Sequence, residues 1–190
     1  MSNRYKCIEC GEEVWLTHSV SKQVWPGLPY LCSAECIVSY IKALPDFTAQ
    51  RSAFQPRQEL DITGDSNPIW DCYTRRHYKS IPEVNFARLL LSEGIEFTYE
   101  AHYLPVGTTI YIPDFLVMRK NLMIEIKGVW SPGSRKKFAK VMELYPPETS
   151  LMIPSFVCYE FGKEVEEKCR ILLNLPELSK KAGRRKWQRI

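Results

Sequence analysis

The sequence has no apolar run approaching the roughly 18 residues that a helix needs to cross a bilayer. Its first ten residues, MSNRYKCIEC, also lack the apolar core of a secretory signal. We therefore expect a cytoplasmic protein with no membrane partner. Hydrophobic residues make up 45% and charged residues 25% of the 190-residue chain, which is the usual composition of a globular protein.

Acidic residues are absent from the last eleven positions, KKAGRRKWQRI, which hold six Lys or Arg. The whole chain carries a net charge of +4, so the remainder of the chain is slightly acidic. A basic tail with one tryptophan suits the phosphates of a nucleic acid, and we predict that residues 180–190 contact DNA through Arg184, Arg185 and Lys186. Composition alone leaves a solvated chain end as the alternative.

The chain has seven cysteines, an odd number, and we expect no signal peptide. Both observations disfavour a disulfide framework. Their spacing indicates a metal site instead. Cys7 and Cys10 are separated by two residues and followed by Gly11, and Cys32 and Cys36 lie where a helix capped by a serine should begin. Four thiolates fill the tetrahedral shell of Zn²⁺ and leave no open position, so we predict a structural zinc module over residues 1–44. It resembles small treble-clef fingers.

A polar segment without periodicity follows at residues 45–69, and we expect a linker or an extended arm. It contains Pro45-Asp46-Phe47. No Glu-x-Lys strand follows this tripeptide, so we do not assign it to a site.

From residue 70 the pattern indicates an α/β domain that ends near residue 179. A helix is expected from Ser80 or Pro82 to Gly94, where the glycine ends it. Further elements are expected as three strands, a helix capped by Ser134, a short strand and a final helix, at residues 95–103, 108–117, 122–130, 134–146, 150–157 and 163–175.

Two carboxylates and an amine interrupt the second and third of these apolar strands. If the strands form a hairpin about residues 118–121, Asp114 lies opposite Glu125, and Lys127 shares a face with Glu125. Facing carboxylates repel each other, and a divalent cation would offset the repulsion. Hard oxygen ligands suit Mg²⁺ or Mn²⁺, and a lysine beside them is typical of sites that hydrolyse a phosphodiester.

The motifs Pro113-Asp114 and Glu125-Ile126-Lys127 resemble those of the PD-(D/E)xK nuclease superfamily. The segments EVNFARLLLSEGIEFTYE, YIPDFLV and IEIKGVWSPGSRKK are similar to phage endonuclease I, a Holliday-junction resolvase. In that family a helix glutamate lies eleven residues before a glycine, as Glu83 lies before Gly94. The resemblance implies a restriction-endonuclease-like mixed sheet flanked by helices. It also implies a catalytic set of Glu83, Asp114, Glu125 and Lys127, with one or two metals held by the three acids and the carbonyl of Ile126.

The sequence departs from that family in two ways. The segment 99–114 is shorter than the bridge through which the family forms swapped dimers, and Gly107 lets it turn back on itself. Homodimer formation therefore stays open. The added zinc module is typical of site-specific homing nucleases of phages, so the substrate is either branched DNA or a specific duplex site.

Two basic clusters flank the predicted site. We expect them to contact DNA phosphates, with a solvated surface as the alternative; they comprise Arg75, Arg76 and Lys79, and Arg135, Lys136, Lys137 and Lys140. A DNA-binding or regulatory protein that does not cleave, and a nuclease acting on RNA, are the alternative functions.

Overall fold

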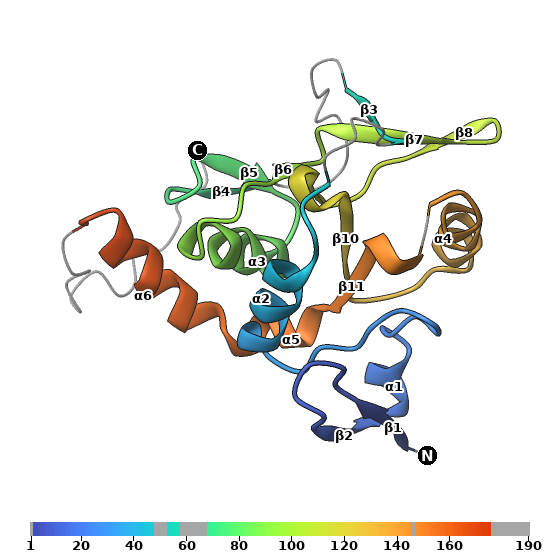
Figure 1. Ribbon diagram of the computed structural model, residues 1–190, viewed down its shortest axis with the longest axis horizontal. Helices are drawn as coiled ribbons and strands as arrows, with labels where there is room; N and C mark the ends of the chain where they lie inside the picture. The colour runs from blue at the N-terminus through green and yellow to red at the C-terminus, as the bar shows by residue number, and fades with distance from the viewer. Residues whose placement is uncertain (1, 48–52, 58–67, 146, 176–190) are drawn as a thin grey trace, which may run out of the picture.

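The computed structural model describes residues 2–47, 53–57, 68–145 and 147–175. In this part of the chain the protein is a mixed α/β structure with several small sheets (Figure 1). The predicted DNA contacts of the tail, Arg184, Arg185 and Lys186, lie outside the described residues. Within the described ranges, no helix is both long and apolar enough to cross a membrane.

The N-terminal module pairs β1 (Ser2–Lys6) with β2 (Glu13–Thr17) in antiparallel fashion, and α1 (His18–Ser21) and α2 (Ala34–Ala43) follow. Ser33 caps α2, as predicted: its hydroxyl accepts a hydrogen bond from the Cys36 amide at 3.3 Å. Ile37 and Ile41 of α2 are fully buried.

The largest sheet has the order β11 (Ser150–Pro154), β10 (Leu122–Lys127), β9 (Phe115–Val117) and β6 (Thr98–Tyr99). The β10–β11 pair is parallel and the others are antiparallel, so the sheet is mixed. Strands β9 and β10 pair Val117 with Leu122 and Phe115 with Ile124. This register is the predicted one. The turn between them contains the 3₁₀ helix Met118–Lys120 and left-handed Asn121.

The helices cover both faces of this sheet. Alternate β10 residues Leu122 and Ile124 pack in one hydrophobic cluster with α3 (Ile81–Ser92), whereas Met123 packs in another with α4 (Pro132–Leu144). Figure 1 shows α3 and α4 on opposite sides of β10. Helix α3 also contacts α5 (Ser155–Glu160) and α6 (Gly162–Leu172).

Two of the expected strands are interrupted. Residues 95–103 are not one strand, because Glu100 adopts a left-handed conformation with φ 45° between β6 and β7 (His102–Val106). Residues 108–117 divide at Ile112–Asp114, where Pro113 lacks an amide donor, into β8 (Thr109–Tyr111) and β9. Strand β7 pairs with β8, and also with β3 (Gln55–Pro56), which lies in the expected linker.

Two helix boundaries also differ from expectation. Helix α4 begins before Ser134, because Ser131 accepts a hydrogen bond from the Ser134 amide at 3.0 Å and Pro132 suits the first turn. Strand β11 ends at Pro154, and the residues expected to continue it form α5.

The β7–β8 hairpin turns at Gly107, which has φ 60°. Val106 faces Thr109 across this turn. The segment 99–114, which was predicted to be too short for a bridge between subunits, therefore folds back on itself within the chain.

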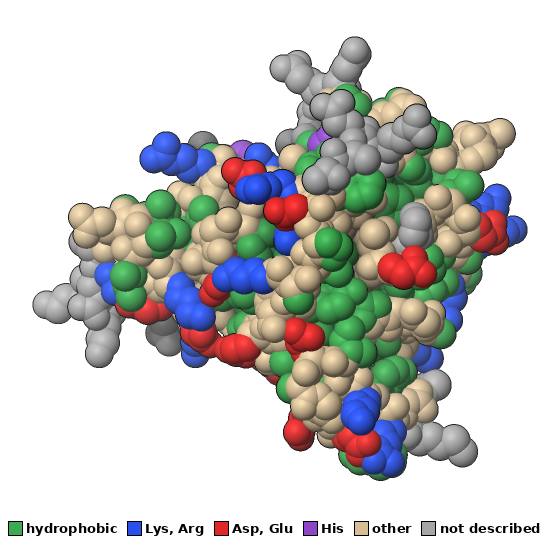
Figure 2. All heavy atoms as spheres, in the orientation of Figure 1, with side chains coloured by type: hydrophobic (Ala, Val, Ile, Leu, Met, Phe, Trp, Pro, Cys, Tyr) green, Lys and Arg blue, Asp and Glu red, His purple; other side chains and the backbone are tan. Residues whose placement is uncertain are grey.

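The N-terminal module, predicted to bind zinc, shares its core with the rest of the molecule. Ile37 and Ile41 of α2 belong to the same buried cluster as Phe86 and Leu90 of α3. A second, short hairpin of β4 (Ile69–Asp71) and β5 (Arg76–Tyr78) joins α3 through a buried ion pair, Arg88 Nη2 to Asp71 Oδ1 at 2.7 Å. On the face seen in Figure 2, positive and negative side chains are interspersed over α2 and α6, in keeping with the Lys42–Glu93 and Lys168–Glu164 ion pairs.

The contact between α6 and α3 leaves no room at Gly162. A Cβ atom there would lie 2.8 Å from the Asn85 Cγ and overlap its amide nitrogen. We expect Gly162→Ala to lower the free energy of unfolding by roughly 1–3 kcal/mol, because overpacking forces a backbone or rotamer shift. Urea denaturation measures this. Gly133→Ala in α4, whose Cβ would meet nothing closer than 4.0 Å, is the control and should stabilise slightly, because it restricts the unfolded chain; equal losses in both variants would contradict the packing argument.

Candidate functional site

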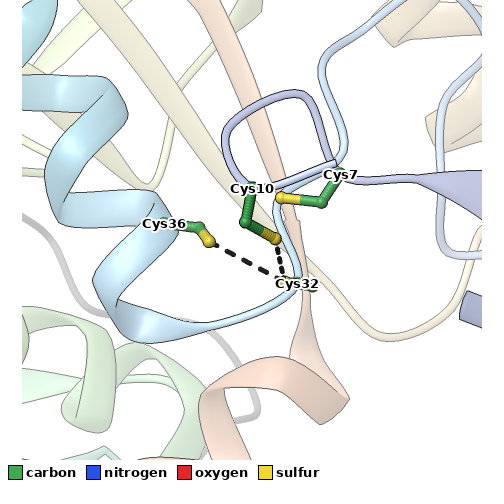
Figure 3. Close-up of side chains that lie close together, drawn as sticks. All are labelled: Cys7, Cys10, Cys32 and Cys36. Carbon is green, nitrogen blue, oxygen red and sulfur yellow. Dashed lines mark hydrogen bonds between the residues drawn. The ribbon is translucent and has the colours of Figure 1, made fainter. Parts of the chain in front are cut away.

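Four cysteines converge at the start of α2 (Figure 3). Cys7 and Cys10 come from the loop after β1, Cys36 from the first turn of α2, and Cys32 from the segment before it. All four sulfur atoms lie within 4.8 Å of one another, and no disulfide joins them. The Cys10–Cys32 and Cys32–Cys36 sulfur distances are 3.5 and 3.8 Å.

This cluster fits a tetrahedral zinc ion. Zn–S bonds of about 2.3 Å place the sulfurs of a tetrahedral site about 3.8 Å apart, which is close to the observed separations. The thiols of the cluster differ in pKa: although burial opposes the charge, amide donors including those of Cys10 and Glu9 lower the pKa of Cys7 to about 7, whereas burial raises the pKa of Cys32 and of Cys36. Gly11, with φ 76°, closes the loop by donating its amide hydrogen bond to the Cys7 carbonyl at 3.0 Å.

The second group of functional side chains lies along the β9–β10 hairpin. Asp114 immediately precedes β9, and its Oδ2 accepts a hydrogen bond from the Ile126 amide at 2.7 Å. Glu125 lies in β10 and is 6% exposed. The β9–β10 register pairs Phe115 with Ile124, so the residues next to this pair are Asp114 and Glu125.

Negative charge accumulates at this hairpin. Burial, and then the carboxylates of Glu125 and Glu83, raise the pKa of Asp114 well above its ordinary value. Ionising Asp114 therefore costs free energy in the absence of a cation. The predicted ligands, three carboxylates and one carbonyl, are hard oxygens, the donor type that Mg²⁺ and Mn²⁺ prefer.

Lys127 contacts both Glu125 and an aromatic ring. Its Nζ lies 2.9 Å from the Glu125 Oε1 and 4.9 Å from the ring centre of Trp130. The side chain is 19% exposed, so a substrate placed against Asp114 and Glu125 would still find its amine accessible.

Glu83 approaches the same region from the first turn of α3. The helix cap Ser80 donates a hydrogen bond to its Oε1 at 2.6 Å, and Tyr99 donates to its Oε2 at 2.5 Å. The residue is 7% exposed, so the carboxylate is held in one orientation.

The three carboxylates are not as close together as the four thiols. In the described ranges, the cysteine cluster is the one group of three or more His, Cys, Asp or Glu whose ligand atoms all lie within 4.8 Å. Each acid instead has a protein donor: Tyr99 and Ser80 for Glu83, the Ile126 amide for Asp114, and Tyr111 for Glu125.

Three residues near the predicted acids were not identified from the sequence: Tyr111, Tyr99 and Glu100. Tyr111 donates a hydrogen bond to the Glu125 Oε2 at 2.5 Å, and Tyr99 does the same for Glu83. Glu100 is buried, forms an ion pair with Lys79, and donates its amide hydrogen bond to the Asp114 carbonyl at 3.0 Å. Tyr99 and Glu100 follow the helix in the quoted motif, but no spacing in the sequence relates them to Glu83 or Asp114.

The predicted DNA contacts lie on two separate elements. Arg75 and Arg76 are exposed on the β4–β5 hairpin, and Lys79, also predicted to contact DNA, is bound to Glu100. His77 is exposed beside the ring of Trp70 at 4.8 Å. The remaining predicted contacts lie in the first three turns of α4, where Arg135, Lys136 and Lys140 are exposed and Lys137 is half-buried.

Residues 69–155, just under half of the chain, match the family model of phage endonuclease I. The matched segment contains Glu83, Asp114, Glu125 and Lys127 and supports a nuclease function. It does not include the zinc module. No curated protein and no solved structure matched the chain.

Proposed function

We propose that residues 70–179 form a metal-dependent endodeoxyribonuclease domain of the PD-(D/E)xK type, with a restriction-endonuclease-like core and the zinc module 1–44 ahead of it. The observation that carries the proposal is the β9–β10 register, which brings Asp114 opposite Glu125 and leaves Lys127 beside Glu125. The family match over the same residues supports it independently.

Each residue of the set has a distinct role in this proposal. Asp114, Glu125, Glu83 and the Ile126 carbonyl would hold one or two Mg²⁺ or Mn²⁺ ions. The chemistry that such ions supply is Lewis acidity, which makes water a stronger nucleophile and neutralises charge on the phosphodiester. Lys127, fixed by Glu125 and Trp130, orients the attacking water and stabilises the charge that develops on the phosphate.

The neighbouring hydrogen bonds serve to position these side chains. Tyr111 and Tyr99 each donate to one acid, and Glu100 holds Lys79 next to Glu83, whose Oε2 accepts the Lys79 amide at 3.0 Å. The exposed arginines and lysines of the β4–β5 hairpin and of α4 bind the DNA backbone on either side.

Branched DNA is the first candidate substrate, because the match is to a phage endonuclease I. A specific duplex site is the second candidate. The β7–β8 hairpin favours it, because this hairpin closes within the chain where a bridge between subunits would otherwise run. Simultaneous cutting of both strands of a junction would require a homodimer.

The test is a cleavage assay on the zinc-loaded protein. A labelled four-way junction and a linear duplex of the same sequence are each incubated with Mg²⁺, with Mn²⁺ and with EDTA. We expect metal-dependent cutting of the junction, with little cutting of the duplex. Cutting of a duplex at one sequence, found by screening a randomised library, would instead establish the second candidate.

Failure to cut has a defined meaning. If the protein binds both DNAs tightly and cuts neither these nor the library in either metal, the nuclease proposal is wrong. The chain would then be a DNA-binding protein on a nuclease fold. Cutting of an RNA of the same sequence at a higher rate would overturn the choice of DNA as substrate.

A further inference from the structure

One segment of the zinc module docks against the predicted nuclease domain beside the catalytic strand. The ring of Trp25, between α1 and α2, lies 5.1 Å from the ring of Trp130 and 4.9 Å from that of Phe138 in α4. Aromatic pairs at these separations contribute beyond simple burial, so the contact fixes the segment against α4.

A second contact places this segment at the end of the central strands. Ser155, just after β11, donates a hydrogen bond to the Gln23 Oε1 at 3.3 Å. In the parallel β10–β11 pair, Lys127 faces Pro154. The segment around Gln23 therefore lies where the carboxyl ends of two parallel strands meet, the edge at which open α/β sheets commonly bind ligands.

A cavity of about 510 Å³ opens between the docked segment and α4. Lys22 lines it from the zinc module, and Gly128, Trp130, Ser131 and Arg135 line it from the nuclease side, together with Val129 and Pro132. Among the described residues that line it there are two cations and no carboxylate. Lys22 and Arg135 are both exposed.

The tryptophans connect this cavity to the catalytic lysine. The Arg135 guanidinium lies 5.7 Å from the ring centre of Trp25 and 5.8 Å from that of Trp130. Lys127 lies 4.9 Å from the ring centre of Trp130. Trp130 is thus shared between the cation that lines the cavity and the amine of the predicted site, and Gly128 is the next residue after Lys127 along the chain.

We propose that this Lys22–Arg135 cavity binds a phosphodiester of the DNA strand close to the bond that is cut, and that the zinc module supplies half of its charge. This inference rests on the proposed function. Two cations against a neutral lining attract a phosphate, and the cavity is wide enough for the attached sugar. The zinc module is then a part of the substrate groove.

Binding of full-length, zinc-loaded protein tests this proposal. The dissociation constant for the four-way junction and for the matched duplex is measured by fluorescence anisotropy, with Ca²⁺ in place of Mg²⁺, at several salt concentrations. We expect Lys22→Ala to raise the dissociation constant about 3- to 10-fold. We also expect the salt dependence to weaken by about one counterion, because one phosphate contact is lost.

The controls separate a local contact from general charge and from folding. Lys6→Ala removes an exposed positive charge from another part of the same module and should leave binding and its salt dependence unchanged. Lys22→Arg should restore both. In the cleavage assay, Lys22→Ala should raise KM and leave kcat within about twofold.

Several results would overturn the inference. Wild-type affinity and salt dependence in Lys22→Ala, or an equal loss in Lys6→Ala, would show that no phosphate contacts Lys22. Saturation of the cavity by inorganic phosphate at micromolar concentration, with loss of that binding in Lys22→Ala, would show a site for a free anion instead of DNA. A protein that binds DNA through Lys22 and never cuts it would refute the nuclease proposal, and only the phosphate contact at Lys22 would remain of this inference.

Discussion

Replacing Asp114 by asparagine should lower metal-dependent cleavage on the order of a thousandfold, equivalent to about 4 kcal/mol of transition-state stabilisation. The asparagine side chain would retain an oxygen to accept the Ile126 amide, so the hairpin keeps its register. It would lack the negative charge that faces Glu125. Because that charge is unfavourable without a cation, we expect the melting temperature of the metal-free protein to be unchanged or higher.

The chain provides a matched control for this substitution. Asp46 lies in a second Pro-Asp-Phe tripeptide, but its side chain is 56% exposed and forms an ion pair with Lys120 at 2.9 Å. Asp46→Asn should leave the cleavage rate within about twofold, since exposed ion pairs contribute little. Initial rates on the DNA substrate, at saturating Mg²⁺, measure both variants. Wild-type activity in Asp114→Asn would exclude the proposed site.

Replacing Cys36 by serine should remove zinc and destabilise the nuclease core together with the module. A structural zinc ion contributes on the order of 10 kcal/mol to the folding of a small module. Here the effect should spread, because Ile37 and Ile41, which follow Cys36 in α2, are buried in one cluster with Phe86 of α3. We therefore expect a single unfolding transition at a much lower temperature.

Cys72→Ser is the control for the thiol itself. Cys72 is exposed and lies outside the four-cysteine cluster, so this variant should keep both its zinc and its melting temperature. Zinc content by elemental analysis and calorimetric melting together measure the effect. An equal zinc content in Cys36→Ser and the wild type would contradict the assignment, and two separate transitions would contradict the shared core.

Local sequence patterns were sufficient for the parts of the fold in which neighbouring residues determine the geometry. The hairpin register followed from alternation on either side of a polar turn, and the Ser33 cap of α2 followed from the cysteine spacing. The four cysteines converge because a tight glycine turn and a helix start each orient one pair.

Features that depend on distant partners could not be predicted. The strand expected at 95–103 breaks at Glu100 because that residue bonds to Lys79 and its amide bonds to Asp114, neither of which periodicity reveals. The short strand Gln55–Pro56 in the expected linker likewise exists because it pairs with β7, a distant partner. Docking of Trp25 on Trp130 joins residues more than a hundred positions apart, and no spacing rule relates them.

The hairpin at Gly107 has a consequence for how two strands would be cut. Because β7 returns as β8 within the same polypeptide, Asp114, Glu125, Lys127 and Glu83 are all supplied by one chain. Because each molecule holds all four residues of the proposed centre, one binding event should produce one nick. Resolution of a junction would then consist of two independent encounters, and nicked product should accumulate when protein is scarce relative to DNA.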